Sequence, residues 1–127
     1  MPGIERFEDL IAWQKARELA RSIYNATKDA PFAKDYDLAR QIQRAAVSVM
    51  TNIAERFERQ GVKEFRRFFL ITKASCAEVR SLLYVAGDLG YLSSETLHKL
   101  LAQADEVARI VTGLRNSLDR NQQKGPR

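Results

Sequence analysis

Apolar residues recur at intervals of about 3.6 positions along four stretches of the chain. No stretch alternates strictly between apolar and polar residues. The observed spacing is typical of amphipathic helices with one buried face, whereas alternation would indicate strands. The pattern predicts helices over residues 9–28, 35–57, 62–89 and 93–118. Because only short loops separate them, we expect an all-α protein that folds as an up-down antiparallel four-helix bundle.

The residues between these segments favour helix starts and stops. Pro31 ends the first helix, because its ring fixes φ and disfavours helical backbone at the residue before it. Gly90 follows the third helix, at the position where a left-handed backbone favours glycine. Short polar side chains that accept hydrogen bonds from the first backbone N–H groups stand at the starts. The expected N-cap residues are Asp9 for the first helix, Asp35 or Asp37 for the second, and Ser93 or Ser94 for the fourth.

The predicted third helix carries more apolar residues than one buried face requires. Leu70, Ile71, Leu82, Val85 and Leu89 flank its main stripe. Surplus apolar surface often marks a partner surface, although single exposed apolar residues are common on soluble proteins. We favour self-association as the explanation.

Length and charge narrow the class of protein. The 127 residues suffice for one domain, placed at residues 1–120, and residues 121–127 are expected to form a disordered basic tail. The apolar share of 45% and the charged share of 29% are those of a soluble globular protein. The net charge is +5 and the predicted pI is about 9.6. This balance favours an anionic partner such as RNA, DNA or an acidic protein face.

Cysteine usage and the absence of long apolar runs indicate a compartment. The single cysteine, Cys76, cannot form a disulfide within the chain, which suits a reducing cytoplasm. The sequence does not open with a signal peptide, and no apolar run approaches the roughly 20 residues needed to span a bilayer. We therefore expect a cytoplasmic protein without a membrane partner.

Candidate catalytic or metal-binding residues are sparse. His98, the only histidine, falls on the polar side of the fourth predicted helix, and Cys76 falls in the core stripe of the third. One histidine and one cysteine do not make a usual zinc site, and a di-iron bundle needs Glu-x-x-His on two helices. The glycines are isolated instead of forming a phosphate-binding loop. We expect no enzyme activity, no metal and no cofactor.

Cations gather where the second predicted helix ends and the third begins. On the third helix they lie on one side, away from the phenylalanine stripe, where they could follow a phosphate backbone. The alternative is a solvated face with internal ion pairs, such as Glu55 with Arg59. The candidate nucleic-acid-binding residues are Arg56, Arg59, Lys63, Arg66, Arg67 and Lys73.

Two further polar patterns each have two interpretations. A polar row on the second predicted helix either lines a seam between helices or marks the boundary of the solvent face. Its members, at three- or four-residue steps, are Ser48, Asn52, Glu55 and Arg59. A second basic group is either a flexible electrostatic arm or a solubilising end. It consists of Arg109, Arg115, Arg120, Lys124 and Arg127.

Several blocks of the sequence resemble one family. These are residues 7–16 (FEDLIAWQKA), 44–55 (RAAVSVMTNIAE), 63–68 (KEFRRF), 75–79 (SCAEV) and 88–92 (DLGYL). In this order they are similar to motifs of the bacterial four-helix bundle proteins encoded in intervening sequences of ribosomal RNA. The resemblance covers roughly residues 7–118. Met50, Thr51 and Arg56 depart from it, standing where the family has proline, alanine and glycine.

The resemblance carries implications that the residue pattern alone does not. It implies a protomer without enzyme activity that assembles into a ring-like homopentamer. A more remote similarity, to the accessory variability determinant of diversity-generating retroelements, implies binding of nucleic acid and of a reverse transcriptase through a basic ring. Arg56 adds a positive charge where the family has none, which strengthens a basic surface.

Our leading hypothesis is therefore an oligomeric helical bundle that binds RNA or DNA as an accessory factor to a reverse transcriptase. The alternative is a protein-interaction module of the rRNA intervening-sequence type that binds no nucleic acid. In that case the surplus apolar faces dock a partner and the charge only maintains solubility.

Overall fold

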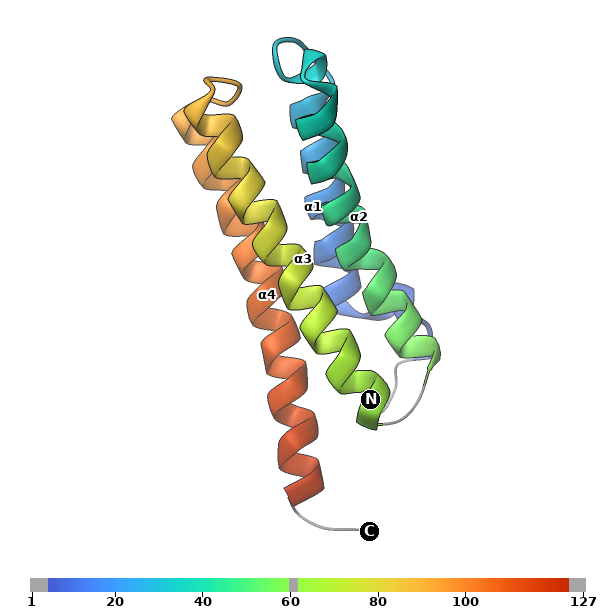
Figure 1. Cartoon of the computed structure of the whole chain (residues 1–127). Coiled ribbons are helices and arrows are strands. Elements are labelled where there is room, and N and C mark those ends of the chain that lie inside the picture. The colour runs from blue at the N-terminus through green and yellow to red at the C-terminus, as the bar shows by residue number, and fades with distance from the viewer. Residues whose placement is uncertain (1–4, 60–61, 124–127) are drawn as a thin grey trace.

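The computed structural model describes the backbone of residues 5–59 and 62–123, and the side chains of residues 5–59 and 66–114. All regular structure in this part of the chain is helical, as predicted. Figure 1 shows the long helices side by side, with consecutive helices running in opposite directions. The elements are η1 (Phe7–Asp9), α1 (Ile11–Thr27), η2 (Phe32–Lys34), α2 (Tyr36–Glu58), α3 (Val62–Asp88) and α4 (Ser94–Gln123).

N-cap residues were predicted for three helices, and two of these predictions are confirmed. Asp35 Oδ1 accepts a hydrogen bond from the Leu38 N–H at 3.3 Å and begins α2. Ser93 Oγ accepts one from the Thr96 N–H at 3.1 Å, next to the first residue of α4. Between the two alternatives predicted for each helix, the structure thus selects Asp35 and Ser93. Each such cap contributes on the order of 1 kcal/mol to stability.

The predicted N-cap of the first helix is wrong. Asp9 lies in the 3-10 turn η1, and α1 begins after Leu10, which offers no side-chain cap. Apolar packing explains the difference. Leu10 is buried, and the Phe7 ring meets the Trp13 ring edge-on with centroids 5.3 Å apart. The turn that places these side chains on the bundle determines where α1 begins.

The end of α3 confirms the role predicted for Gly90. Its φ is +77°, in the left-handed region that favours glycine. The Tyr91 N–H donates to the Ala86 carbonyl at 2.9 Å, and the Gly90 N–H donates to the Gly87 carbonyl at 3.0 Å. These paired bonds define a Schellman motif, which satisfies carbonyls left free at the helix end.

The core runs along the axis of the bundle, and every long helix contributes side chains to it. Cys76 is 2% exposed and lies in this core, as predicted. Each large aliphatic side chain buried in this way contributes about 1.5–3 kcal/mol relative to exposure. The largest fully buried apolar residues are Leu19, Ile23, Phe32, Ile42, Val49, Ile53, Val79, Leu83, Val107 and Val111.

One end of the bundle is tied together by side chains from two loops. The Tyr91 hydroxyl donates to Asp35 Oδ2 at 3.0 Å, and the Tyr91 ring lies 5.3 Å from the ring of Phe32. The hydrogen bond to Asp35 raises the pKa of Tyr91 above its ordinary value. Asp35 therefore joins the start of α2 to the α3–α4 loop, at the end where both loops lie (Figure 1).

The C-terminal part of the chain is helical up to Gln123. α4 thus continues into the segment 121–127 for which we predict a disordered tail, while residues 124–127 lie outside the described part of the chain. Over the described residues, no helix is long and apolar enough to cross a membrane.

Candidate nucleic-acid interface

Three of the predicted arginines meet in one hollow between α2 and α3. Arg56 and Arg59 come from the end of α2, and Arg67 comes from the second turn of α3. The hollow has a volume of about 280 Å³. We call it the arginine hollow, and its lining residues are Asn52, Glu55, Arg56, Arg59, Arg67, Phe68 and Ile71.

The α2 side of the hollow is shaped by the way this helix ends. Arg59 is the C-cap residue, with an extended backbone and its N–H donating to the Glu55 carbonyl at 3.1 Å. The Arg56 guanidinium donates through Nη1 to the Arg59 carbonyl. Carbonyls at a helix C-terminus lack partners within the helix and carry partial negative charge, so a guanidinium is favourable there. Arg56 is therefore held at the helix end, beside the hollow.

The α3 side supplies an apolar floor and one exposed cation. Phe68 is buried, Ile71 is partly exposed, and Arg67 is exposed at the rim. Among the described lining residues, three guanidinium groups accompany one carboxylate, that of Glu55. A concave surface with excess positive charge raises the local concentration of anions.

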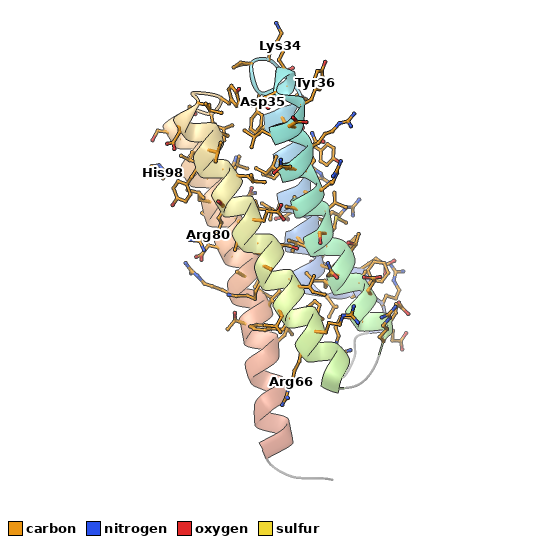
Figure 2. The ribbon with its side chains drawn as sticks, in the orientation of Figure 1. Lys34, Asp35, Tyr36, Arg66, Arg80 and His98 are labelled. Atoms are coloured by element: carbon orange, nitrogen blue, oxygen red, sulfur yellow. The ribbon has the colours of Figure 1, made fainter. Side chains whose placement is uncertain are left out.

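Among the described members of the predicted set, Arg56, Arg59 and Arg67 line the arginine hollow, whereas Arg66 and Lys73 do not. Lys73 turns toward α4, where its ammonium donates to Thr112 Oγ1 at 3.3 Å. Arg66 is exposed and directed away from α2 (Figure 2). Residues 66 and 73 are seven positions apart and share a helix side, whereas Arg67 lies about 100° around from Arg66. The Lys63 side chain lies outside the described residues.

A second hollow follows the first along the same two helices. Its volume is about 270 Å³, and it combines one arginine, Arg44, with one carboxylate, Glu78, and with neutral polar groups. We call it the serine hollow, and its lining residues are Gln41, Arg44, Ala45, Ser48, Ser75 and Glu78.

Hydrogen bonds between polar side chains connect the two hollows. Asn52 Nδ2 donates to the Ser48 carbonyl at 2.7 Å and to Ser48 Oγ at 2.9 Å. Ser48 Oγ lies 3.2 Å from Ser75 Oγ of α3. The first part of the polar row on the second helix is thus a seam between helices, whereas its last two residues are exposed, so each of the two interpretations holds for part of the row. Ser75 and Arg44 were missed as site residues, since a single helix pattern does not show what lies across a groove.

Other candidate chemistry in the described chain is isolated. His98 is exposed, as predicted, on the far side of the bundle from α2 (Figure 2). Burial raises the pKa of the Cys76 thiol to about 11, although Lys73 and Arg80 act in the opposite direction. No group of three or more potential metal ligands occurs among the described residues. In the second basic group, Arg109 forms an ion pair with Asp105, and the side chains from Arg115 onward are not described.

Fold and groove together define the class of protein: an all-α bundle whose consecutive helices α2 and α3 enclose a polar, arginine-bearing groove. Comparison with known families then gives the family. The model of the 23S rRNA-intervening sequence protein family matches residues 8–113, and the chain belongs to this family. No curated protein matches the chain. The resemblance to this family is confirmed, and the remoter similarity to the retroelement accessory protein stays a prediction.

Proposed function

We propose that the protein binds nucleic acid without catalysing a reaction, and that the arginine hollow is its phosphate-binding site. The observation that carries the proposal is the convergence of Arg56, Arg59 and Arg67 from two helices onto one concavity. Guanidinium groups donate two parallel hydrogen bonds to phosphate oxygens, which makes arginine well suited to phosphate recognition. Neutralising phosphates also releases counterions, a large source of affinity for nucleic acids.

Charge reversal at Arg67 tests the proposal. Arg67 is the best single position, because Arg56 also closes the end of α2, so that its loss would change the helix itself. Arg80 is the matched control: it is an exposed arginine on the same helix, on the side of the bundle away from α2 (Figure 2). We expect Arg67→Glu to weaken binding at least tenfold and Arg80→Glu to change it little.

Fluorescence anisotropy with a labelled structured RNA and a DNA duplex gives the measurement. Affinity should fall steeply between low and physiological salt, with a log–log slope that approaches the number of phosphates contacted. Arg67→Glu should reduce this slope. Equal affinity of Arg67→Glu and wild type would reject the site, and absence of binding at low salt would reject the function.

A reverse transcriptase is the protein partner that we propose, on the basis of the similarity to the retroelement accessory protein. The genome position of the gene tests this part separately. A reverse-transcriptase gene beside it supports the retroelement role. A position inside a ribosomal RNA gene favours the other branch of the family, and with it a function unrelated to reverse transcription.

Self-association is the second function that we propose, and the outer face of α3 supports it. We call this face the α3 apolar face, made of Leu70, Ile71, Ala74, Ala77, Ser81, Tyr84, Val85 and Leu89. All of these residues are exposed in the single chain, with Leu70 at 67% and Leu89 at 54%. Small residues in its centre allow a second helix to approach closely. Five copies is the number that the family resemblance implies.

A further inference from the structure

The Ser48–Asn52–Ser75 network occupies the middle of the groove between α2 and α3. Asn52 lines the arginine hollow, while Ser48 and Ser75 line the serine hollow. The network therefore connects the two hollows. Ser75 is 9% exposed, and Ser48 and Asn52 are half-buried, so hydrogen bonds made here compete less with water than bonds at the rim.

A count of donors and acceptors shows what this network still offers. Both hydrogens of Asn52 Nδ2 are used within α2, by the carbonyl and the hydroxyl of Ser48. The Asn52 carbonyl oxygen, Oδ1, receives no hydrogen bond from the described residues. Ser48 and Ser75 share one hydroxyl hydrogen across 3.2 Å, which leaves the other hydroxyl hydrogen for a further acceptor. The groove thus presents one acceptor and one donor close together.

Arginine side chains lie on both sides of the Ser48–Asn52–Ser75 network. Arg44 lies in the serine hollow, and Arg59 in the arginine hollow, fifteen positions later along the chain. At 1.5 Å per helical residue this corresponds to about 22 Å. A nucleic-acid strand held by phosphates at both ends would place its sugars over the neutral centre. This placement of the strand rests on the proposed function, because it requires phosphates bound at the arginines.

We propose that the groove selects RNA over DNA, because the Ser48–Asn52–Ser75 network binds the ribose 2′-hydroxyl. A 2′-hydroxyl both donates and accepts a hydrogen bond, and it is the group that distinguishes RNA from DNA at a given site. It donates to Asn52 Oδ1 and accepts the free hydroxyl hydrogen of the serine pair. Deoxyribose leaves both partners in the half-buried groove without a hydrogen bond, which costs affinity.

Two oligonucleotides that differ only at the 2′ position give the sharpest test. Fluorescein-labelled 20-mers of oligo(U) and oligo(dU) are titrated with the full chain at one fixed salt concentration, with anisotropy as the readout. One hydrogen bond corresponds to about a fivefold change in affinity. Because the 2′-hydroxyl makes one or two such bonds, we expect the wild type to bind oligo(U) roughly 5- to 25-fold more tightly than oligo(dU).

The variant Asn52→Ala with Ser75→Ala removes the two groups that would contact ribose. We expect the ratio of the two affinities to fall to about one, because the 2′-hydroxyl no longer has its two partners. The matched control, Asn25→Ala with Ser94→Ala, removes an exposed asparagine and an exposed serine that lie outside both hollows and outside the α3 apolar face, and it should keep the wild-type ratio. Far-UV circular dichroism verifies that each variant is folded. If the double variant is unfolded, Ser75→Ala alone replaces it, and we expect a smaller fall in the affinity ratio.

The outcomes separate this inference from the proposed function. Equal wild-type affinity for the two oligonucleotides, or a ratio that survives in Asn52→Ala with Ser75→Ala, would overturn RNA selection by the network. Arg67→Glu should lower both affinities together and leave their ratio unchanged. Absence of binding to either oligonucleotide at low salt would instead overturn the proposed function.

Discussion

Thr72 carries a hydroxyl that is fully buried on α3, and Thr72 Oγ1 has no hydrogen-bond partner among the described residues. A buried polar group without a partner costs about 1–3 kcal/mol. We expect Thr72→Val, which keeps the branched shape, to raise the free energy of unfolding by about 1 kcal/mol. Urea denaturation followed by circular dichroism measures the change.

Thr112 is the control for this substitution. Its hydroxyl donates to the Ala108 carbonyl at 2.9 Å and accepts from Lys73 at 3.3 Å. Thr112→Val should therefore lower stability by about 1 kcal/mol, with the opposite sign. A loss of stability in Thr72→Val would show that this hydroxyl has a partner after all.

The buried thiol of Cys76 makes the free energy of unfolding depend on pH in the alkaline range. The pKa of its thiol rises from 9.0 to about 11, chiefly because burial disfavours the thiolate. The unfolded chain loses this proton near pH 9 and the folded chain near pH 11, so the unfolded state binds fewer protons between these values. The contribution to stability is therefore constant below pH 9 and falls as pH rises from 9 to 11.

Cys76→Ala isolates this effect. Urea midpoints at pH 8 and pH 10.5 should drop further for the wild type than for the variant, because other groups titrate in both proteins. An equal drop in the two proteins would mean that the buried thiol does not control this transition.

Among single residues, the sequence predicted the arginines that line the hollow but did not predict which of the candidate cations lie together. It predicted Arg56, Arg59 and Arg67, which meet in one hollow, and it added Lys73, which donates to Thr112 of α4. A helix pattern gives the angle of a side chain around its own axis. It does not say which neighbour lies at that angle, so the two flanks of α3 could not be told apart.

Among the elements, the end of α3 gives the clearest test of a local rule. Gly90 has a φ of +77°, where a residue with a Cβ is strained. We expect Gly90→Ala to lower the free energy of unfolding by about 1–2 kcal/mol. Gly113 in α4 is the matched control, since a Cβ there meets nothing within 4 Å and its backbone is helical.

Gly113→Ala should raise stability by about 0.5–1 kcal/mol, because alanine loses less conformational freedom in a helix than glycine does. Thermal unfolding of the two variants and the wild type measures both changes in stability, which should have opposite signs. Equal effects of the two substitutions would mean that the backbone at Gly90 adapts to alanine.

The elements themselves could be predicted because each combines apolar periodicity with a local stop or start signal. Asp35, Gly90 and Ser93 act through bonds within a few residues, so their roles follow from nearby sequence. Asp9 failed as a cap because the packing of Phe7 on Trp13 decides where α1 begins. That contact depends on how the turn folds back, which capping preferences do not describe.

For the whole molecule, the α3 apolar face predicts assembly. Leu70 and Tyr84 are exposed on it at 67% and 52%. We expect the wild type to form an oligomer and Leu70→Glu with Tyr84→Glu to be monomeric, because the charges would be buried in the contact. Light scattering coupled to size-exclusion chromatography measures the mass of each.

Ile11→Glu is the control, since Ile11 is similarly exposed, at 63%, but lies on α1. It should leave the oligomer intact. A monomeric wild type, or an oligomer unaffected by both α3 substitutions, would remove the α3 apolar face as the contact surface.

The up-down arrangement of the whole molecule could be predicted, because short loops leave consecutive helices few ways to pack. The groove between α2 and α3 could not be predicted from the sequence. Its two hollows depend on Ser75 meeting Ser48 across two helices, twenty-seven positions apart. Pairings of this kind arise from the rotation of packed helices about their axes, which the apolar stripe of each helix fixes only approximately.

Among the described residues, those that line the two hollows lie between Gln41 and Glu78, and neither α1 nor the described side chains of α4 contribute to the lining. The described lining of the groove is therefore encoded by one uninterrupted stretch of the gene. A single recombination event that exchanges this stretch would transfer the groove intact between two bundles of the same fold. The outer surfaces of α1 and α4 are free to diverge without altering it, so groove and surroundings can evolve at different rates.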